Sequence, residues 1–250
     1  MFNPKLSVIT IVFNNVRDIE RTMLSVINQT YSNIEYIIVD GLSTDGTLNV
    51  IKQYRDRIHT LISERDNGIY DAMNKGLAAA TGDYVLFMNS GDEIYSANTV
   101  SAVFATATDA DIYYGETEMI NNAGHSLGQR RHKAPRQFTW KSFKYGMSIS
   151  HQAIYIKRSL AQPYNLKYQL SADIDWILQA AKKAKMIVKV HQYVAKYLVG
   201  GMSKAKHKQS LLERFAIMRE HYGWVPTLFN HAVIALNLSW YWLLHRRTND

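Results

Sequence analysis

The sequence predicts an α/β protein in which a mostly parallel, Rossmann-like central sheet is flanked by helices and followed by a C-terminal apolar helix. Apolar, β-branched runs alternate with segments of helical periodicity within the first hundred residues. This alternation is typical of parallel sheets with crossover helices. Polar side chains follow directly after several of the runs. Ligands of such sheets bind outside the carboxyl ends of the strands, so we expect the functional site there.

Each expected strand of the first half is a short apolar run that ends at a polar residue or a turn. The first run is almost continuously apolar and β-branched, which suits a strand that is covered on both faces. Between the runs, apolar residues recur three or four positions apart, as on one face of a helix. We therefore expect strands at residues 6–13, 34–39, 58–62 and 84–88, and helices around residues 19–27, 50–54 and 69–80.

After residue 95 the alternation is less regular, and no repeat or low-complexity linker divides the chain. We treat residues 1–220 as one domain with two halves, 1–95 and 96–220, and residues 221–250 as a separate C-terminal helix. In the second half we expect strands near residues 112–119, 153–156 and 186–190, a hairpin turn at residues 121–124, and helices near residues 100–104, 174–181 and 211–218.

Residues 224–244 contain no Asp, Glu, Lys or Arg. As a helix, this segment would be about 31 Å long, which is enough to cross a bilayer core. Polar residues nevertheless fall on one side of it, and aromatic residues lie near both ends, followed by Arg246 and Arg247. This pattern favours a helix that lies in the membrane interface. The alternatives are a membrane-spanning helix and a helix that packs on the protein itself.

The chain has 250 residues, no cysteine and a formal net charge of +8. The lack of cysteine excludes disulfides, thiolate metal sites and cysteine nucleophiles, and fits a reducing compartment. The first residues lack the apolar core of a signal peptide, so we expect a cytoplasmic protein. Lysines crowd the C-terminal third, which suits an anionic membrane face, a phosphorylated substrate or simply a solvated surface. Nucleic acid is not expected as a partner, because no stacking motif accompanies the basic residues.

Common nucleotide-binding and zinc-binding motifs are absent from the sequence. Gly41 and Gly46 have the spacing of a P-loop, but Thr47 stands where the lysine is required. No Gly-x-Gly occurs, which excludes the dinucleotide fingerprint. No His-Glu-x-x-His helix is present. The glycine-rich first loop that holds phosphate in sugar-nucleotide pyrophosphorylases is also missing.

The apolar run at residues 84–88 leads into Asn89-Ser90-Gly91-Asp92-Glu93. A buried strand that ends at a small-residue corner presents an acid at the rim of the sheet. We predict that Asp92 binds Mg²⁺ or Mn²⁺, hard cations that take oxygen ligands and neutralise a diphosphate. The alternative is that Asp92 and Glu93 cap the following helix. Asp40, which follows the second run, either accepts the ring N–H of a uracil or guanine base or forms an Asx-turn.

Four motifs lie in order along the first hundred residues: Ser7-Val-Ile-Thr-Ile-Val-Phe-Asn14, Asp40-Gly-Leu-Ser-Thr-Asp-Gly-Thr47, Ser63-Glu-Arg-Asp-Asn-Gly-Ile-Tyr-Asp-Ala-Met-Asn-Lys-Gly76 and Asn89-Ser-Gly-Asp92. Together they resemble the family 2 glycosyltransferases. The resemblance implies a GT-A fold, a UDP- or GDP-linked sugar donor, a divalent metal and an inverting mechanism. One element departs from the family pattern, because the usual Asp-x-Asp or Asp-Asp is Ser90-Gly91-Asp92 here. Asp92 matches the metal-binding aspartate, and the carboxylate that usually helps hold the donor ribose is missing.

The resemblance also implies which residues bind the donor. In the first half, which would bind the nucleotide, these are Phe13, Asn14, Asp40, Asp66 and Lys75. For Lys75 the alternative is a surface ion pair with the aspartate four residues before it on the same helix. In the second half, a glycine loop followed by lysines is similar to a late loop that closes over the donor diphosphate, where glycines let backbone amides approach phosphate. This loop contains Gly200, Gly201 and Ser203, followed by Lys204, Lys206 and Lys208.

The second half, which would bind the acceptor, contains the expected general base. Residues 171–178 are similar to the family's Glu-Asp-x-Asp element, which implies Asp173 as the base, with Asp175 as the second choice. An inverting transfer needs one base to take the proton of the acceptor hydroxyl. The alternative for Asp173 is a charge at a helix N-terminus. His151 and Gln152 open a strand at the place where family members contact the acceptor.

The motifs, and the resemblance that they carry, therefore imply a metal-dependent inverting glycosyltransferase. Its acceptor would be a saccharide or a lipid-linked saccharide of cell-surface polysaccharide biosynthesis, and the protein would be peripheral on the inner face of the cell membrane. A basic loop at residues 130–133 would contact phosphate or lipid headgroups, or be solvated. A sugar-nucleotide nucleotidyltransferase and a non-catalytic, membrane-bound nucleotide-sugar-binding module are the alternatives. The sequence does not define the sugar, the base, the acceptor or the oligomeric state.

Overall fold

The computed structural model describes residues 2–130, 133–200 and 207–245. Its first half is a run of four parallel strands with the pairing order β3-β2-β1-β4, connected by helices on both sides of the sheet. The predicted strand–helix alternation of this half is therefore confirmed. The elements are β1 (Leu6–Val12), α1 (Ile19–Ile27), β2 (Ile34–Asp40), α2 (Thr47–Gln53), β3 (Thr60–Ser63), α3 (Ile69–Ala79) and β4 (Tyr84–Phe87).

The second half extends the sheet with strands of both directions. β8 (Ile154–Lys157) is antiparallel to β4, β6 (Ile112–Ile120) is antiparallel to β8, and β9 (Ile187–Leu198) is parallel to β6. The short strands β5 (Glu93–Ile94) and β7 (Ser126–Gln129) are antiparallel to β9 and β6. The described strands thus form one mixed sheet, and the prediction of a mostly parallel sheet was wrong. The physical reason is that a short hairpin such as β6–β7 joins antiparallel neighbours without a crossover helix.

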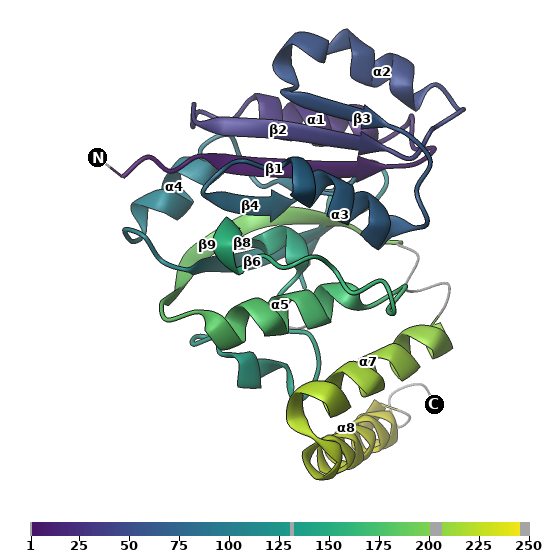
Figure 1. The fold of residues 1–250 in the computed structure, drawn as a ribbon. Coiled ribbons are helices and arrows are strands. Elements are labelled where there is room, and N and C mark those ends of the chain that lie inside the picture. Colours follow the sequence, from purple (N-terminus) through teal and green to yellow (C-terminus); the bar gives the residue numbers. More distant parts are fainter. Residues whose placement is uncertain (1, 131–132, 201–206, 246–250) are drawn as a thin grey trace.

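Each face of the sheet carries its own hydrophobic core. Along β1, Ile9 packs on one face with Met73 of α3 and with α5 (Ala172–Lys183), whereas Val8 packs on the other face with Met23 of α1 and with α4 (Thr99–Ala105). Successive side chains of a strand point to opposite faces, so a continuously apolar run requires cover on both. Figure 1 shows α3 and α5 in front of the sheet and α1 behind it. This double cover leaves the strand ends as the place for polar residues.

The helices α7 (His207–Tyr222) and α8 (Trp224–His245) lie together at the end of the molecule opposite to α2 (Figure 1). Thr227 and Asn230 of α8 are buried, whereas Val225 and Phe229 are 78% and 65% exposed. The polar side of this segment therefore faces the protein. In the part of the chain that the structure describes, no helix combines the length and apolar character needed to cross a membrane. The spanning alternative and the expected apolar C-terminal helix are thus not supported, since Thr227, Asn230 and His231 interrupt the apolar sequence.

Short 3-10 helices connect the longer elements. One of them contains His151, and it leads directly into β8. The predicted late strand at residues 186–190 extends much further, to Leu198, and this extension brings the end of β9 next to the segment that follows β4. The division of the chain near residue 220 stays a prediction. The 3-10 helices are η1 (Arg55–Arg57), η2 (Trp140–Phe143), η3 (His151–Ala153) and η4 (Arg158–Leu160).

Candidate active site

A cavity of about 650 Å³ is lined by residues from both halves of the chain. Asp92 reaches it from the segment after β4, Asp173 from the first turn of α5, and His151 from the 3-10 helix before β8. Gln152 and Gly200 line the same cavity. The structure therefore brings together the predicted metal ligand, the predicted base, both predicted acceptor residues and one residue of the predicted late loop.

Asp92 is only 5% exposed, and both of its carboxylate oxygens accept hydrogen bonds. Gln152 donates from Nε2 to Oδ2 at 2.5 Å, and the backbone N–H of Leu198 donates to Oδ1 at 3.0 Å. Burial raises the pKa of Asp92 to about 6, although these two hydrogen bonds act in the opposite direction. Asp92 and Glu93 do not cap the following helix, because α4 begins after Asn98.

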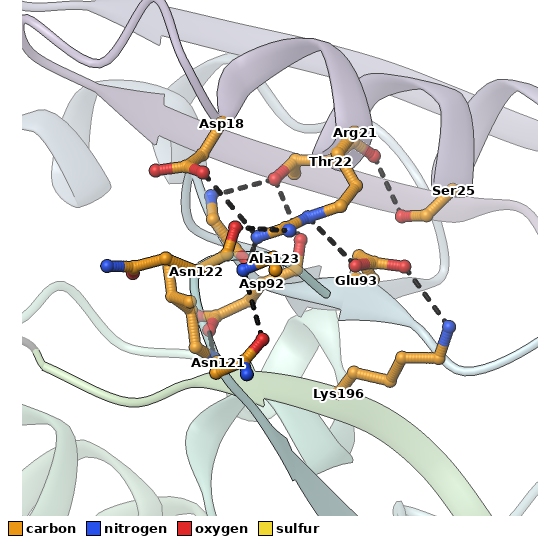
Figure 2. A network of polar contacts seen from close by, with 12 residues as sticks. Asp18, Arg21, Thr22, Ser25, Asp92, Glu93, Asn121, Asn122, Ala123 and Lys196 are labelled. Carbon is orange, nitrogen blue, oxygen red and sulfur yellow. Dashed lines mark hydrogen bonds and ion pairs between the residues drawn. The ribbon is translucent and has the colours of Figure 1, made fainter. Parts of the chain in front are cut away.

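Helix α1 fixes the backbone of the segment that carries Asp92 (Figure 2). The Thr22 hydroxyl donates to the carbonyl oxygen of Asp92 at 2.8 Å and accepts from the N–H of Gly91 at the same distance. Arg21 donates to the carbonyl oxygen of Gly91 at 3.2 Å and pairs with Glu93 at 2.9 Å. Asp92 is therefore held through its backbone by α1 and through its carboxylate by Gln152 and Leu198. The further residues of this network include Asp18, Ser25, Asn122 and Lys196.

The surroundings of Asp92 fit a ligand of a divalent cation. Its two hydrogen-bond donors, Gln152 and the Leu198 amide, are uncharged, so within the described part of the chain this buried anion has no direct cationic partner. At the same corner, Oδ1 of Asn89 is buried without a hydrogen-bond partner among the described residues. Across residues 2–130, 133–200 and 207–245, no cluster of three or more His, Asp or Glu side chains could hold a metal ion. A cation here would take one protein carboxylate and complete its shell with other oxygens, as Mg²⁺ does with phosphates and water.

Asp173 lies on the other side of the cavity and has the opposite electrostatic character. Its Oδ2 is 3.6 Å from Nδ1 of His151, and its Oδ1 accepts from the Tyr70 hydroxyl at 3.2 Å. Burial alone would raise the pKa of Asp173, but His151, Tyr70 and the charge of Arg214 outweigh burial and lower it. Nε2 of His151 contacts Nδ2 of Asn89 at 3.1 Å. The carboxylate of Asp173 therefore stays ionised near neutral pH, as a general base requires.

Asp175, the second choice for the base, is separated from the cavity by the geometry of α5. It is 3% exposed, pairs with Nε2 of His221 at 2.6 Å and accepts from Gln179 at 2.7 Å. Residues two positions apart on a helix point in different directions. The fold consequently gives the two aspartates different surroundings, and only Asp173 lines the cavity.

The other predicted donor-binding residues of the first half do not line this cavity. Asp40 is fully buried and accepts from the Ser63 hydroxyl at 2.7 Å and from the N–H of Ser43 at 3.2 Å. These contacts form the turn that was the alternative for Asp40. Lys75 pairs with Glu64 at 2.9 Å and with Asp71 at 3.8 Å, which includes the expected i,i+4 pair.

Phe13 and Asp66 lie beside each other at the carboxyl ends of β1 and β3. A side-chain Cβ at Gly41 would be 3.3 Å from Phe13 and only 2.4 Å from the carboxylate of Asp66, so any larger residue there would displace the Asp66 side chain. Phe13 is 63% exposed, and Asn14 adopts a left-handed backbone with φ of 48°. Their donor-binding roles stay predictions. Gly201 and Ser203, with Lys204 and Lys206, lie outside the described residues.

Sequence reasoning missed several residues of the cavity. Gln152 was predicted as a site residue, but its hydrogen bond to Asp92 was not foreseen, and its role in acceptor binding stays a prediction. Tyr70 lies in the third motif, and its position there was the available signal. Arg130 belongs to the basic loop noted above, and Arg214 of α7 had no signal. Arg21 and Thr22 support the segment that carries Asp92 without lining the cavity. No sequence signal pointed to them either, because their contacts depend on how α1 packs.

Comparisons with known proteins agree with this architecture. The model of Glycosyl transferase family 2 matches residues 7–162. A "PGL/p-HBAD biosynthesis glycosyltransferase" of Mycobacterium bovis is 32% identical over 225 residues, which cover 86% of this chain and 85% of the relative.

Two solved structures share the fold. TarS of S. aureus, in complex with UDP, has a TM-score of 0.65 and 20% identity and covers 98% of this chain and 73% of its own. The mannosyltransferase PcManGT of Pyrobaculum calidifontis, in complex with GDP-Man and Mn²⁺, has a TM-score of 0.66 and 20% identity, over 95% and 71%. The expected GT-A fold is thereby confirmed.

Proposed function

Since the chain belongs to glycosyl transferase family 2, we propose that it is an inverting glycosyltransferase that moves a sugar from a UDP- or GDP-linked donor to an acceptor hydroxyl. The observation that carries this proposal is the pairing of Asp92 and Asp173 in one cavity, with pKa values shifted in opposite directions. Two carboxylates whose environments separate their pKa values are typical of sites that give them different roles. The nucleotides bound to TarS and PcManGT support the donor class.

Asp173 acts as the general base of the proposed reaction. It takes the proton of the acceptor hydroxyl while that oxygen forms a bond to C1 of the donor sugar. The bond between C1 and the phosphate oxygen breaks, and the nucleoside diphosphate leaves with the electron pair from the opposite side. Tyr70 and His151 contact both oxygens of the Asp173 carboxylate, so they orient the base and keep it ionised.

Asp92 holds Mg²⁺ or Mn²⁺ in the proposed enzyme. When bound, the cation supplies positive charge that stabilises the diphosphate leaving group. Gln152 and the Leu198 amide fix the orientation of the Asp92 carboxylate, and Thr22 fixes its backbone. The chain therefore contributes one strongly positioned carboxylate at the donor side of the cavity.

The substitution Asp173→Asn tests the proposal. It should reduce sugar transfer by about 10²–10⁴-fold, the usual contribution of a general base, and leave nucleotide binding intact. Donors are found by following thermal stabilisation with UDP- and GDP-sugars and Mn²⁺. Asp175→Asn is the matched comparison, because Asp175 is buried elsewhere. Unchanged transfer by Asp173→Asn would favour a binding module, and loss only in Asp175→Asn would move the base to that residue.

We also propose that α8 docks the protein on an anionic membrane surface, where a lipid-linked acceptor would be presented at the inner face of the cell membrane. Val225, Leu228 and Phe229 are 78%, 55% and 65% exposed, so the apolar side of α8 faces away from the protein. Leu212 is 72% exposed on α7, the helix that lies beside α8 in Figure 1. The net charge of +8 complements anionic headgroups.

Vesicle flotation tests this surface. The double variant Val225→Ser with Phe229→Ser should bind vesicles that contain anionic lipid at least tenfold more weakly than the parent protein. Leu166→Ser is the control, since Leu166 is 52% exposed but lies in the loop before α5. Equal flotation of the parent protein and the double variant would contradict membrane docking by α8 and leave the transferase proposal untouched.

A further inference from the structure

Arg130 places a positive charge in the wall of the cavity on the side of the predicted base. It directly follows β7, and its guanidinium donates to the Ser150 hydroxyl at 2.9 Å and to the carbonyl oxygen of Met147 at 3.4 Å. Ser150 is 7% exposed and precedes His151, the partner of Asp173. The two contacts therefore fix the guanidinium beside the loop that carries His151.

No carboxylate forms an ion pair with Arg130 within residues 2–130, 133–200 and 207–245. Its two hydrogen-bond partners are neutral oxygens. Burial lowers the pKa of Arg130, which reflects the cost of holding a charge away from water, but a guanidinium stays protonated in proteins. Arg130 is partly buried, and Asp173, a carboxylate whose charge acts on it, already contacts His151 and Tyr70. A ligand anion would therefore lower the cost of holding the guanidinium in the cavity wall.

A second guanidinium faces the same cavity from α7. Arg214 lines it, and across the described residues this side chain also has no ion-pair partner. Its charge lowers the pKa of both Asp173 and Arg130, so it is close enough to act on each. Two like charges that converge on one space repel each other, and an anion between them removes that repulsion.

The position of these charges distinguishes donor from acceptor. Asp92 and its anchors on α1 define the donor side, whereas Ser150, the hydrogen-bond partner of Arg130, directly precedes His151, which faces Asp173. We propose that the acceptor carries an oxyanion, either a phosphate or a carboxylate, which Arg130 and Arg214 bind beside the base. This inference rests on the proposed transferase function and adds the substrate class of the acceptor. A planar guanidinium donates two parallel hydrogen bonds to either oxyanion.

The test uses the full chain with Mg²⁺ and saturating UDP or GDP, so that the donor side is occupied. Inorganic phosphate and glucuronate are then titrated separately, and the melting temperature is followed. At least one anion should raise it further. Stabilisation by phosphate would indicate a phosphorylated acceptor, and stabilisation by glucuronate would indicate an acidic sugar.

The variant Arg130→Met should bind that anion at least tenfold more weakly and keep the nucleotide-dependent shift. Arg136→Met is the matched control, because Arg136 is exposed and does not line the cavity. Arg214→Met, in an exposed position, provides a second variant that does not depend on the packing around Arg130.

Two results would overturn the acceptor proposal alone: a nucleotide shift without any anion shift, or loss of the nucleotide shift in Arg130→Met with the anion shift retained. If no nucleotide stabilises the parent protein with metal, the transferase proposal fails as well. The two failures are therefore distinguishable.

Discussion

Gln152 donates a 2.5 Å hydrogen bond to the carboxylate of Asp92, although the two residues belong to different halves of the chain. Gln152 is 2% exposed and directly follows His151, which contacts Asp173. One short 3-10 helix, η3, thus contacts both carboxylates of the cavity. The relation between the predicted metal ligand and the predicted base is set by this helix rather than by either aspartate alone.

Replacement of Gln152 should affect donor binding. In Gln152→Leu the buried Asp92 keeps only the Leu198 amide as a donor, and the protein should lose about 1–3 kcal/mol of unfolding free energy. Metal-dependent nucleotide binding should also weaken. Gln179→Leu removes a similar hydrogen bond to Asp175, outside the cavity. It should lower stability without changing nucleotide binding, and equal loss of binding in both variants would contradict a positioning role for Gln152.

Asp92→Asn should weaken metal binding and increase the stability of the metal-free protein. The folded-state pKa of Asp92, about 6, lies above the 3.8 of an unperturbed aspartate. The stability that the carboxyl group contributes is therefore present below pH 4 and is lost as pH rises through 6. In EDTA at pH 7.5 the free energy of unfolding of the asparagine variant should therefore exceed that of the parent protein. The pKa shift of Asp92 sets the upper limit of this difference at about 3 kcal/mol. Urea unfolding at pH 7.5 and pH 4 measures the difference, which should shrink at pH 4. Asp56→Asn, at an exposed position, is the control.

Metal binding should depend on pH in the same range. A proton and a cation compete for the Asp92 carboxylate, whose pKa is about 6. Below pH 6 the apparent Kd for Mn²⁺, measured by titration with saturating nucleotide, should rise about tenfold for each pH unit. A pH-independent Kd between pH 5 and 7 would show that Asp92 is not the ligand.

Tyr70→Phe should change the base rather than the fold. The variant loses the hydroxyl that donates to Asp173 and so raises the pKa of that carboxyl group, while the ring can keep its stacking on Tyr164 at 5.3 Å. Because the pKa of Asp173 is low, the base becomes protonated, and activity is lost, only at low pH. In the variant the pKa is higher, so the loss of activity should begin at a higher pH. The pH profile of kcat measures the shift. Tyr54→Phe, whose hydroxyl contacts only Glu20 in the described structure, should leave the profile unchanged.

The sequence predicted those parts of the fold and site that local pattern determines. Four apolar runs were sufficient to place the parallel half of the sheet, and Asp92 followed from the end of the fourth. The extension of β9 to Leu198 was not predictable, because its half-buried residues mix polar and apolar types without a continuous run. The hydrogen bond from that strand to Asp92 was consequently missed as well.

Contacts between distant segments were the second kind of omission. Arg130 reaches the cavity because β7, which it follows, pairs with β6, and nothing in a basic loop distinguishes a partly buried arginine from a solvated one. Asp40 has the same ambiguity in reverse, since a residue at a strand end can either face a ligand or cap its own turn. The packing brings Ser63 against Asp40 and forms the turn contacts, and a role of Asp40 in donor binding stays a prediction.

Gly91 restricts the positions near Asp92 at which a second carboxylate can be introduced. Its backbone φ is +103°, and an added Cβ would lie 2.8 Å from the Leu198 side chain, so an aspartate there would meet both backbone strain and a steric clash. Ser90 is partly exposed, and its hydroxyl accepts a hydrogen bond from the Asn15 amide. An Asp-Asp arrangement therefore places a side chain on the unfavourable backbone of position 91 and also displaces the Leu198 side chain, whereas Asp-x-Asp requires only the replacement of Ser90. Homologues of this chain that recover a second carboxylate by a single substitution are expected to carry it at position 90.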